Sequence, residues 1–198
     1  MLFKRVVDIA KKLDTKYIRV FSFYNNSDEW SADKRDEVVA RLKRMIEYAK
    51  SEGIILLHEN EKDIYGDTIE RCLYLMEHLY CDSFKTVFDP ANFVQCAQDT
   101  KEVFDMLRSY IEYIHINDAL SDGTVVPSGR GIGNINYILK NLFHSGYDGY
   151  LSIETHLGSF YGLSSLEKYS KTERLHKSGE ETFKLAFDYL NTIIDEII

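Results

Sequence analysis

Four side chains that can bind a metal ion or move a proton stand at or near the ends of short apolar segments. They are Glu59, Asp89, His115 and Glu154. Three carboxylates and one imidazole suit Mn²⁺, Mg²⁺ or a similar divalent ion, and water or substrate oxygens can complete an octahedron. Carboxylates in such a site can also serve as general acids and bases. These residue types therefore predict metal-assisted proton transfer if the fold brings the four groups together.

A structural role is the alternative for each of these residues taken singly. A carboxylate at the end of a strand is more often the N-cap of the next helix or a salt-bridge partner. Acidic caps on different helices, beside a stacked histidine, would be the joint structural explanation. Four such groups at four successive segment ends favour the metal site over that explanation.

The segments that carry these groups alternate with helical patterns. Short β-branched or aromatic runs begin near residues 17, 54, 86, 113 and 150, and spacings of roughly 30 residues are typical of βα units. Parallel crossovers of this kind are right-handed. Because parallel strands end at the same edge of a sheet, we expect the four groups to converge there. The apolar helical stripes lie at 2–13, 38–49, 69–79, 103–107, 135–143 and 183–194.

Small polar residues and glycines mark where these helices begin and end. A polar side chain before the first turn can accept a hydrogen bond from its N–H groups, and glycine ends a helix in the left-handed conformation. The predicted N-caps are Asp67, Asp99 or Thr100, and Asn134; Ser178-Gly-Glu-Glu181 has capping-box spacing, and Gly53 and Gly146 are the predicted helix ends.

Two architectures have this βα period, an open parallel sheet and a (β/α)₈ barrel. Five units decide neither, because a complete barrel needs about 250 residues and the chain has 198, beginning on a helix. We expect one partial domain over residues 1–198. In it, the run containing Ile18 and Val20 would form a free sheet edge, and such an edge invites pairing with another chain, here as a homo-oligomer.

Composition narrows the functional classes. Lys and Arg number 24 against 32 Asp and Glu, a net charge of −8, which disfavours a nucleic-acid partner. The three cysteines are an odd number and lack metal-ligand spacing, which disfavours a disulfide framework or a zinc site and fits a reducing compartment. No apolar stretch approaches the roughly 20 residues of a membrane span, and the first residues lack a signal-peptide pattern. We therefore expect a cytoplasmic protein without a membrane partner.

Five segments of the chain carry a family resemblance: Leu57-His-Glu-Asn-Glu61, Phe88-Asp-Pro-Ala-Asn-Phe93, Ile114-His-Ile-Asn-Asp-Ala119, Val126-Pro-Ser-Gly-Arg-Gly131 and Gly146-Tyr-Asp-Gly-Tyr-Leu-Ser-Ile-Glu-Thr-His156. Together they resemble the sugar phosphate isomerase/epimerase family, the xylose isomerase-like group of TIM barrels. The resemblance implies an incomplete (β/α) barrel containing strands 4 to 8. It also implies that Glu59, Asp89, His115 and Glu154 bind the divalent metal, and that Glu59 and Glu154 exchange protons with the substrate.

The activity implied is that of a metal-dependent isomerase or epimerase of a small sugar, sugar phosphate or polyol. Mn²⁺ is the expected metal, with Mg²⁺, Co²⁺ and Zn²⁺ as alternatives. Epimerisation and aldose–ketose isomerisation both pass through an enediolate, so the sequence does not separate them. A catalytically inactive metal- or sugar-binding module is the alternative function. The DNA-repair endonuclease branch of the superfamily is disfavoured by the acidic charge and by only six histidines.

Further residues are expected near the substrate. Alternation along a strand turns His58 away from Glu59, so we expect it to pack in the interior. The expected substrate-binding residues are Asn92, Asp118, Arg130 and His156. Asn92 could instead close a turn, and Asp118 and Arg130 could instead orient His115. Asp118, Arg130 and His156 could also be ordinary loop residues. Asn117 replaces a lysine that many family members carry. The glycines at 129, 131 and 133 lack the context of a dinucleotide-binding fingerprint.

Overall fold

The computed structural model describes residues 2–25, 29–154, 156–157 and 179–198. The chain divides into two compact units. The first comprises Met1–Phe88 and Leu107–Glu112, and the second comprises Asp89–Met106 and Tyr113–Ile198.

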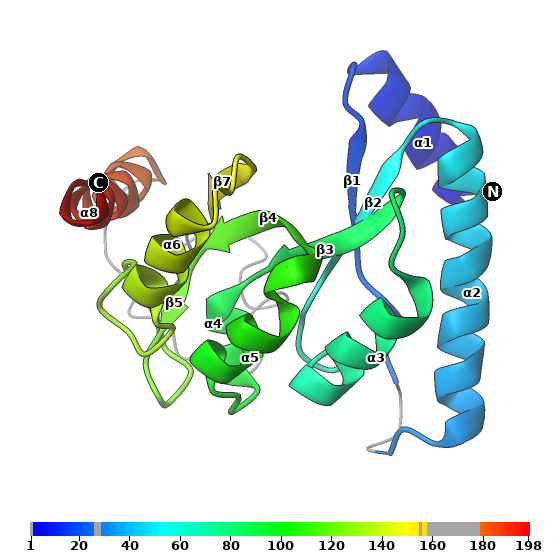
Figure 1. Cartoon of the computed structure of the whole chain (residues 1–198), viewed down its shortest axis with the longest axis horizontal. Helices are drawn as coiled ribbons and strands as arrows, with labels where there is room; N and C mark the ends of the chain where they lie inside the picture. Colours follow the sequence, from blue (N-terminus) through cyan, green and yellow to red (C-terminus); the bar gives the residue numbers. More distant parts are fainter. Residues whose placement is uncertain (1, 26–28, 155, 158–178) are drawn as a thin grey trace. The chain divides into compact units, whose positions relative to one another are not determined.

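The helices and strands alternate as the sequence pattern predicts (Figure 1). The five predicted strands begin within two residues of their expected starts, whereas a short strand pair and a short helix after β3 were not predicted. The strands are β1 (Tyr17–Val20), β2 (Ile55–Glu59), β3 (Phe84–Phe88), β4 (Ile111–Ile116), β5 (Asp118–Ala119), β6 (Val125–Val126) and β7 (Tyr150–Ile153). The helices are α1 (Leu2–Lys12), α2 (Ala32–Ser51), α3 (Ile69–Leu79), α4 (Pro90–Gln95), α5 (Thr100–Leu107), α6 (Ile135–His144) and α8 (Gly179–Ile197), with a 3₁₀ turn, η1 (Arg108–Tyr110).

The main sheet has five strands in the order β1-β2-β3-β4-β7. The pairs β1–β2, β2–β3 and β4–β7 are parallel, so the predicted parallel α/β class is confirmed. The other strand pair, β5–β6, is antiparallel and forms a separate two-stranded sheet. Parallel pairing places the last residues of neighbouring strands at a common edge, which is where a site built from strand ends must lie.

In the first unit, α1, α2 and α3 pack against β1, β2 and β3 (Figure 1). A polar network links the beginnings of three strands on this unit. The Tyr17 hydroxyl donates to Oε1 of Glu112 and Lys85 Nζ donates to Oε2, each at 2.6 Å. Burial raises the pKa of Glu112, but the bonds from Lys85 and Tyr17 outweigh it and hold the pKa below its ordinary value.

His58 packs in the interior of the first unit, as the strand alternation predicted. It is 1% exposed, its ring centroid lies 6.2 Å from that of Phe84, and a Cβ on Gly66 would come within 2.6 Å of its Cε1. Its Nε2 is buried without a hydrogen-bond partner in the described part of the chain. Burial lowers the pKa of His58 to about 4, because a charged imidazole loses its hydration there.

We expect His58 to make the free energy of unfolding about 2 kcal/mol smaller at pH 5 than at pH 7.5. The ordinary pKa of the His58 side chain is 6.5 and its folded-state pKa is about 4. Above pH 6.5 the imidazole is neutral in both states, and the fold keeps its full stability. As the pH falls from 6.5 towards 4, the unfolded chain binds a proton that the folded protein does not bind, so the free energy of unfolding decreases. Urea titrations at both pH values should find this difference in the wild type and not in His58→Leu. His144→Gln, at an exposed histidine, should keep the wild-type pH dependence. Equal pH dependence in the wild type and His58→Leu would refute the assignment.

One predicted helix cap is wrong, and a second stands at the predicted position without a side-chain cap bond. Asp67 does not cap α3: the N-cap is Thr68, which makes no side-chain cap bond, and Arg71 Nη1 instead donates to Asp67 Oδ1 at 2.6 Å. Asn134 is the N-cap residue of α6, but its side chain makes no cap bond. Its backbone is left-handed, with φ of 57°, and its Nδ2 donates to Thr100 Oγ1 at 2.8 Å.

The remaining boundaries agree with the sequence where they are described. Asp99 Oδ1 accepts hydrogen bonds from two N–H groups in the first turn of α5. Gly53 and Gly146, which follow α2 and α6, have φ of 72° and 77°, the left-handed conformation that glycine adopts without strain. The predicted capping box begins at Ser178, which lies outside the described residues.

Membrane-spanning helices and disulfide bonds are the last two features that the sequence addresses. No helix among the described residues is long and apolar enough to span a membrane. Cys72, Cys81 and Cys96 are free thiols, as expected for three cysteines without a pairing pattern.

Candidate metal centre

Asp89 is placed by the junction between β3 and α4. It follows the buried strand directly and precedes Pro90, whose fixed φ suits the first residue of a helix. As the N-cap of α4, Asp89 accepts a hydrogen bond from the Asn92 N–H on Oδ1, at 2.9 Å. Asn117 Nδ2 donates to its other oxygen, Oδ2, at 3.4 Å. The carboxylate is 1% exposed and is therefore fixed by contacts on both oxygens.

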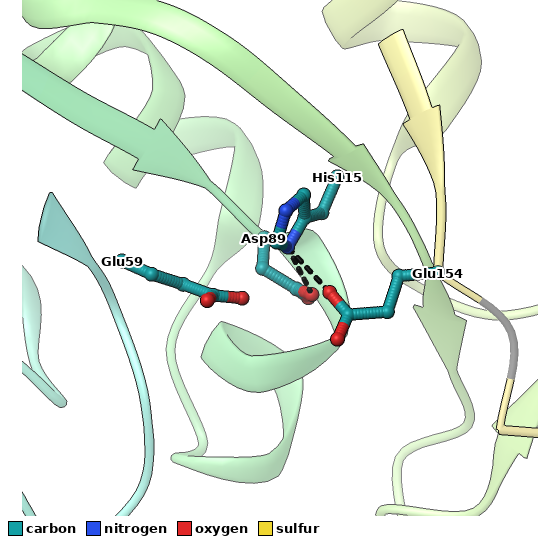
Figure 2. Close-up of side chains that lie close together, drawn as sticks. All are labelled: Glu59, Asp89, His115 and Glu154. Carbon is teal, nitrogen blue, oxygen red and sulfur yellow. Dashed lines mark ion pairs between the residues drawn. The ribbon is translucent and has the colours of Figure 1, made fainter. Parts of the chain in front are cut away.

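His115 and Glu154 meet Asp89 within the second unit (Figure 2). His115 lies on β4 beside Ser152 of β7, and Glu154 follows β7 with its N–H donating to Ile116 O at 3.3 Å. His115 Nδ1 lies 2.5 Å from Glu154 Oε2 and 3.8 Å from Asp89 Oδ2. One potential ligand atom from each of the three lies within 4.8 Å of the others.

This arrangement fits a divalent metal by its donor set. Two carboxylates face one imidazole in a part of the fold where Asp89 and His115 are buried. The carboxylate of Asp89 is buried and that of Glu154 is partly buried, so a metal ion between these two negative groups would offset their repulsion. The predicted convergence of strand ends is thus seen for these three groups. Asp89 also acts as a helix cap, so the capping alternative describes one of its oxygens.

Glu59 ends β2 in the first unit and is drawn with the other three groups in Figure 2. Its side chain is 1% exposed. Arg19 Nη1, on the neighbouring strand β1, donates to Glu59 Oε2 at 2.8 Å. A carboxylate so deeply buried needs a partner of opposite charge, and Arg19 supplies one.

Asp118 organises a loop. Its carboxylate is fully buried and accepts the N–H groups of Ala119, Gly129, Gly131 and Gly133 at 2.8–3.0 Å. Burial raises the pKa of Asp118 above its ordinary value, although the four amides favour the charged form. The glycine-rich segment therefore binds a carboxylate of its own chain. The substrate contact expected of Asp118 stays a prediction.

Gly131 shows why this loop requires glycine. A Cβ at that position would lie 2.3 Å from Ala119 O and 2.4 Å from Asp118 Oδ1. Neither atom can move far, because Ala119 O belongs to the backbone and Asp118 Oδ1 accepts the N–H groups of Ala119 and Gly133. The spacing that superficially suggested a dinucleotide fingerprint thus arises from close packing around Asp118.

The other expected substrate residues have different surroundings. The backbone N–H of Asn92 closes the turn after Asp89. Arg130 is exposed, and its N–H donates to Pro127 O at 3.0 Å. His156 Nε2 lies 3.8 Å from Glu154 Oε1. The His156 side chain therefore lies beside one of the three clustered groups, and substrate binding by any of the four expected residues stays a prediction.

Two residues beside the expected ligands were missed by the sequence reasoning. Arg19 is the only charged residue of β1, and a lone charge within a short apolar strand is a signal of a buried partner. Asn117 had been noted only as a departure from a lysine, whereas it donates to Asp89. A pairwise hydrogen bond of this kind leaves no pattern in a single sequence.

Comparison with known proteins places the fold. A family model described as the xylose isomerase-like TIM barrel matches residues 2–193. None of the curated proteins matches the chain. The predicted fold class, an incomplete barrel of this type, agrees with both the match and the five-stranded sheet.

Solved structures resemble the chain closely in fold and distantly in sequence. An L-ribulose 3-epimerase aligns with a TM-score of 0.79 at 17% identity, covering 99% of this chain and 67% of its own. The IOLI protein, solved with a zinc atom, gives 0.76 at 17% identity, covering 99% and 69%. A D-allulose 3-epimerase from Methylomonas sp., in complex with D-allulose, gives 0.75 at 16% identity, covering 100% and 68%. The chain spans between 64% and 69% of the length of such structures.

Proposed function

The chain belongs to the xylose isomerase-like TIM barrel family, and from that premise we propose that it is a metal-dependent isomerase or epimerase of a small sugar or polyol. The observation that carries the proposal is the convergence of His115, near the end of β4, with Asp89 and Glu154, which directly follow β3 and β7. Sugar epimerases with this fold are among the similar structures. Because the chain spans about two thirds of their length, activity, substrate and partners all belong to the proposal.

Glu59, Asp89, His115 and Glu154 are the proposed metal ligands. Each offers one potential ligand atom, and a set of three carboxylates with one imidazole is rich in hard oxygen donors. We propose Mn²⁺ first, with Mg²⁺, Co²⁺ and Zn²⁺ as alternatives. When bound, the ion would polarise a substrate carbonyl and stabilise negative charge on its oxygen.

Glu59 and Glu154 are the proposed acid and base. One would remove the proton alpha to the carbonyl and the other would return a proton at the resulting enediolate, on the opposite face for an epimerase. Arg19 holds Glu59, and His115 lies against Glu154, so each carboxylate has a neighbour that fixes its orientation. A base that is already held in position loses less conformational entropy when it reaches the geometry of proton transfer.

The substrate contacts proposed are those of Asn92, Asp118, Arg130 and His156. Arg130 is exposed and its guanidinium suits a phosphate or another oxyanion, so a sugar phosphate is included in the substrate class. His156 lies beside Glu154 and suits a hydroxyl. The cytoplasm, where cysteines stay reduced, is the proposed location.

The test is a calorimetric titration of the metal-free chain with Mn²⁺, followed by a screen for turnover with D-allulose and L-ribulose. We expect one Mn²⁺ site and, in deuterated water, incorporation of solvent deuterium at the carbon alpha to the ketose carbonyl, read by NMR. Metal binding without exchange on any ketose would favour the alternative, an inactive metal- or sugar-binding module. Failure to bind Mn²⁺ or another divalent ion would refute the metal-dependent function.

We also propose that a second copy of the chain covers the free edge of β1. In the described sheet β1 has β2 as its only neighbour. Helix α1, which packs against β1, exposes Leu2, Val6 and Ile9, and the exposed Leu13 follows directly after the helix. An apolar stripe beside an open edge is self-complementary in a two-fold dimer. Light scattering should find a dimer for the wild type and a monomer for Ile9→Glu; a monomeric wild type would contradict this proposal.

A further inference from the structure

Arg19 and Glu59 form an ion pair across the first two strands of the sheet. Arg19 is paired in register with Leu57, so Glu59 lies two residues further along the neighbouring strand on the same face. The guanidinium Nη1 donates to Oε2 at 2.8 Å. Both residues belong to the first unit, so the pair is built within one compact part of the chain.

The two members of the pair differ greatly in burial. The Glu59 side chain is 1% exposed and the Arg19 side chain is 47% exposed. The arginine therefore reaches from the surface to a carboxylate that has almost no contact with water. Its own position is supported by Phe21, whose ring centroid lies 4.8 Å from Arg19 Cζ, a cation–π contact that limits the motion of the guanidinium.

We propose that Arg19 is the positioning residue of Glu59. The inference rests on the proposed function, in which Glu59 is a metal ligand and an acid/base group. By holding Oε2, Arg19 limits the rotation of the carboxylate about its terminal bonds and keeps it pointed as it leaves β2. A glutamate has three side-chain dihedral angles. If Arg19 restricts them in the metal-free protein, less side-chain conformational entropy is lost when the metal binds.

In an ordinary surface ion pair, both the arginine and the carboxylate are exposed to solvent. Arg41 and Glu37 on α2 form such a pair at 2.6 Å, with 49% and 53% of their side chains exposed, and exposed pairs of that kind contribute little to stability. Arg41 also stacks on an aromatic ring, that of Phe23, at 5.2 Å. Arg41 is therefore a matched control for Arg19 in length, charge, ring contact and unit, differing in the burial of its carboxylate.

The charge of Arg19 has an effect on metal binding that is opposite to its orienting effect. The positive charge of Arg19 repels a cation held by Glu59, so its removal would tighten metal binding on that ground alone. The half-exposed guanidinium is screened by water and salt, whereas the loss of a residue that orients a metal ligand typically weakens affinity 10–100-fold. We therefore expect the orienting effect to exceed the repulsion.

The test is a calorimetric Mn²⁺ titration of the full chain and its variants, which needs no substrate. Arg19→Met should weaken Mn²⁺ binding by about tenfold, and Arg19→Lys, which keeps the charge and one donor, should restore it to within about threefold of the wild type. Arg41→Met should bind like the wild type. In a Glu59→Gln background, Arg19→Met should have no further effect, because Arg19 acts through Glu59.

The outcomes separate this inference from the proposed function. Wild-type affinity in Arg19→Met, or an equal loss with and without Glu59, would overturn the positioning role and leave the metal site standing. A wild-type chain that takes up no Mn²⁺ would overturn the proposed function and this inference with it. Urea unfolding checks that each variant folds; if Arg19→Met does not, Arg19→Gln, which keeps an N–H donor without the charge, takes its place in the same comparison.

Discussion

Asp89→Asn should bind Mn²⁺ at least about a hundredfold more weakly than the wild type and unfold at nearly the same urea concentration. Changes at residues that only orient a ligand already cost 10–100-fold in affinity, so replacing a charged ligand by a neutral amide should cost more. The fold should survive because asparagine caps helices as well as aspartate, and its amide oxygen can keep the 2.9 Å bond from the Asn92 N–H. Calorimetry with Mn²⁺ and a urea titration measure the two quantities.

Asp118→Asn is the matched control for that result. It makes the same chemical change at another buried aspartate, but one whose oxygens accept four backbone N–H groups. The amide nitrogen of asparagine replaces one oxygen and cannot accept the two N–H groups bound there, so we expect a loss of about 3 kcal/mol in the free energy of unfolding. The Mn²⁺ affinity of the folded protein should be unchanged. If Asp118→Asn lost the metal and Asp89→Asn only stability, the roles of the two residues would be reversed.

The sequence predicted the parts of the fold that follow from local pattern. Asp89 illustrates this well: a buried run ends, a carboxylate follows, and Pro90 starts a helix, so one short segment specifies a strand end and a cap. The positions of His115 and Glu154 relative to Asp89 follow from the rule that parallel strands end at one edge. That rule uses only strand direction, which the length of the βα units already determines.

The parts that could not be predicted depend on contacts between distant segments. Asp118 was expected near the substrate, and its four amide partners lie 1–15 residues away on a loop whose course no propensity specifies. Asp67 was expected to cap α3, but Arg71 one turn later competes for its carboxylate. The Arg19–Glu59 pair depends on the register of β1 against β2. A one-residue slip would turn Arg19 to the other face of the sheet.

Glu154→Gln should reduce the rate of proton exchange at the ketose by about 10³-fold, measured at saturating Mn²⁺ as deuterium incorporation from solvent. The expected size is that of a lost general acid–base group, and saturation with metal removes the part of the effect that comes from weaker metal binding. The substitution keeps the shape of the side chain and removes its ability to accept a proton. Glu154 Oε2 lies 2.5 Å from His115 Nδ1, and Glu154 Oε1 lies 3.8 Å from His156 Nε2. These two histidines can hold either the glutamate or the glutamine side chain in place.

Glu112→Gln is the control for Glu154→Gln, because it removes a carboxylate that is bonded to Tyr17 and Lys85 at the beginnings of the strands. We expect it to lower stability and to leave the exchange rate per folded molecule unchanged. Exchange that persists at the wild-type rate in Glu154→Gln with Mn²⁺ bound would show that another group moves the proton. Exchange lost in Glu154→Gln and retained in Glu112→Gln would assign the proton transfer to the end of β7. Both variants replace a glutamate by a glutamine, so they differ only in the position of the substitution.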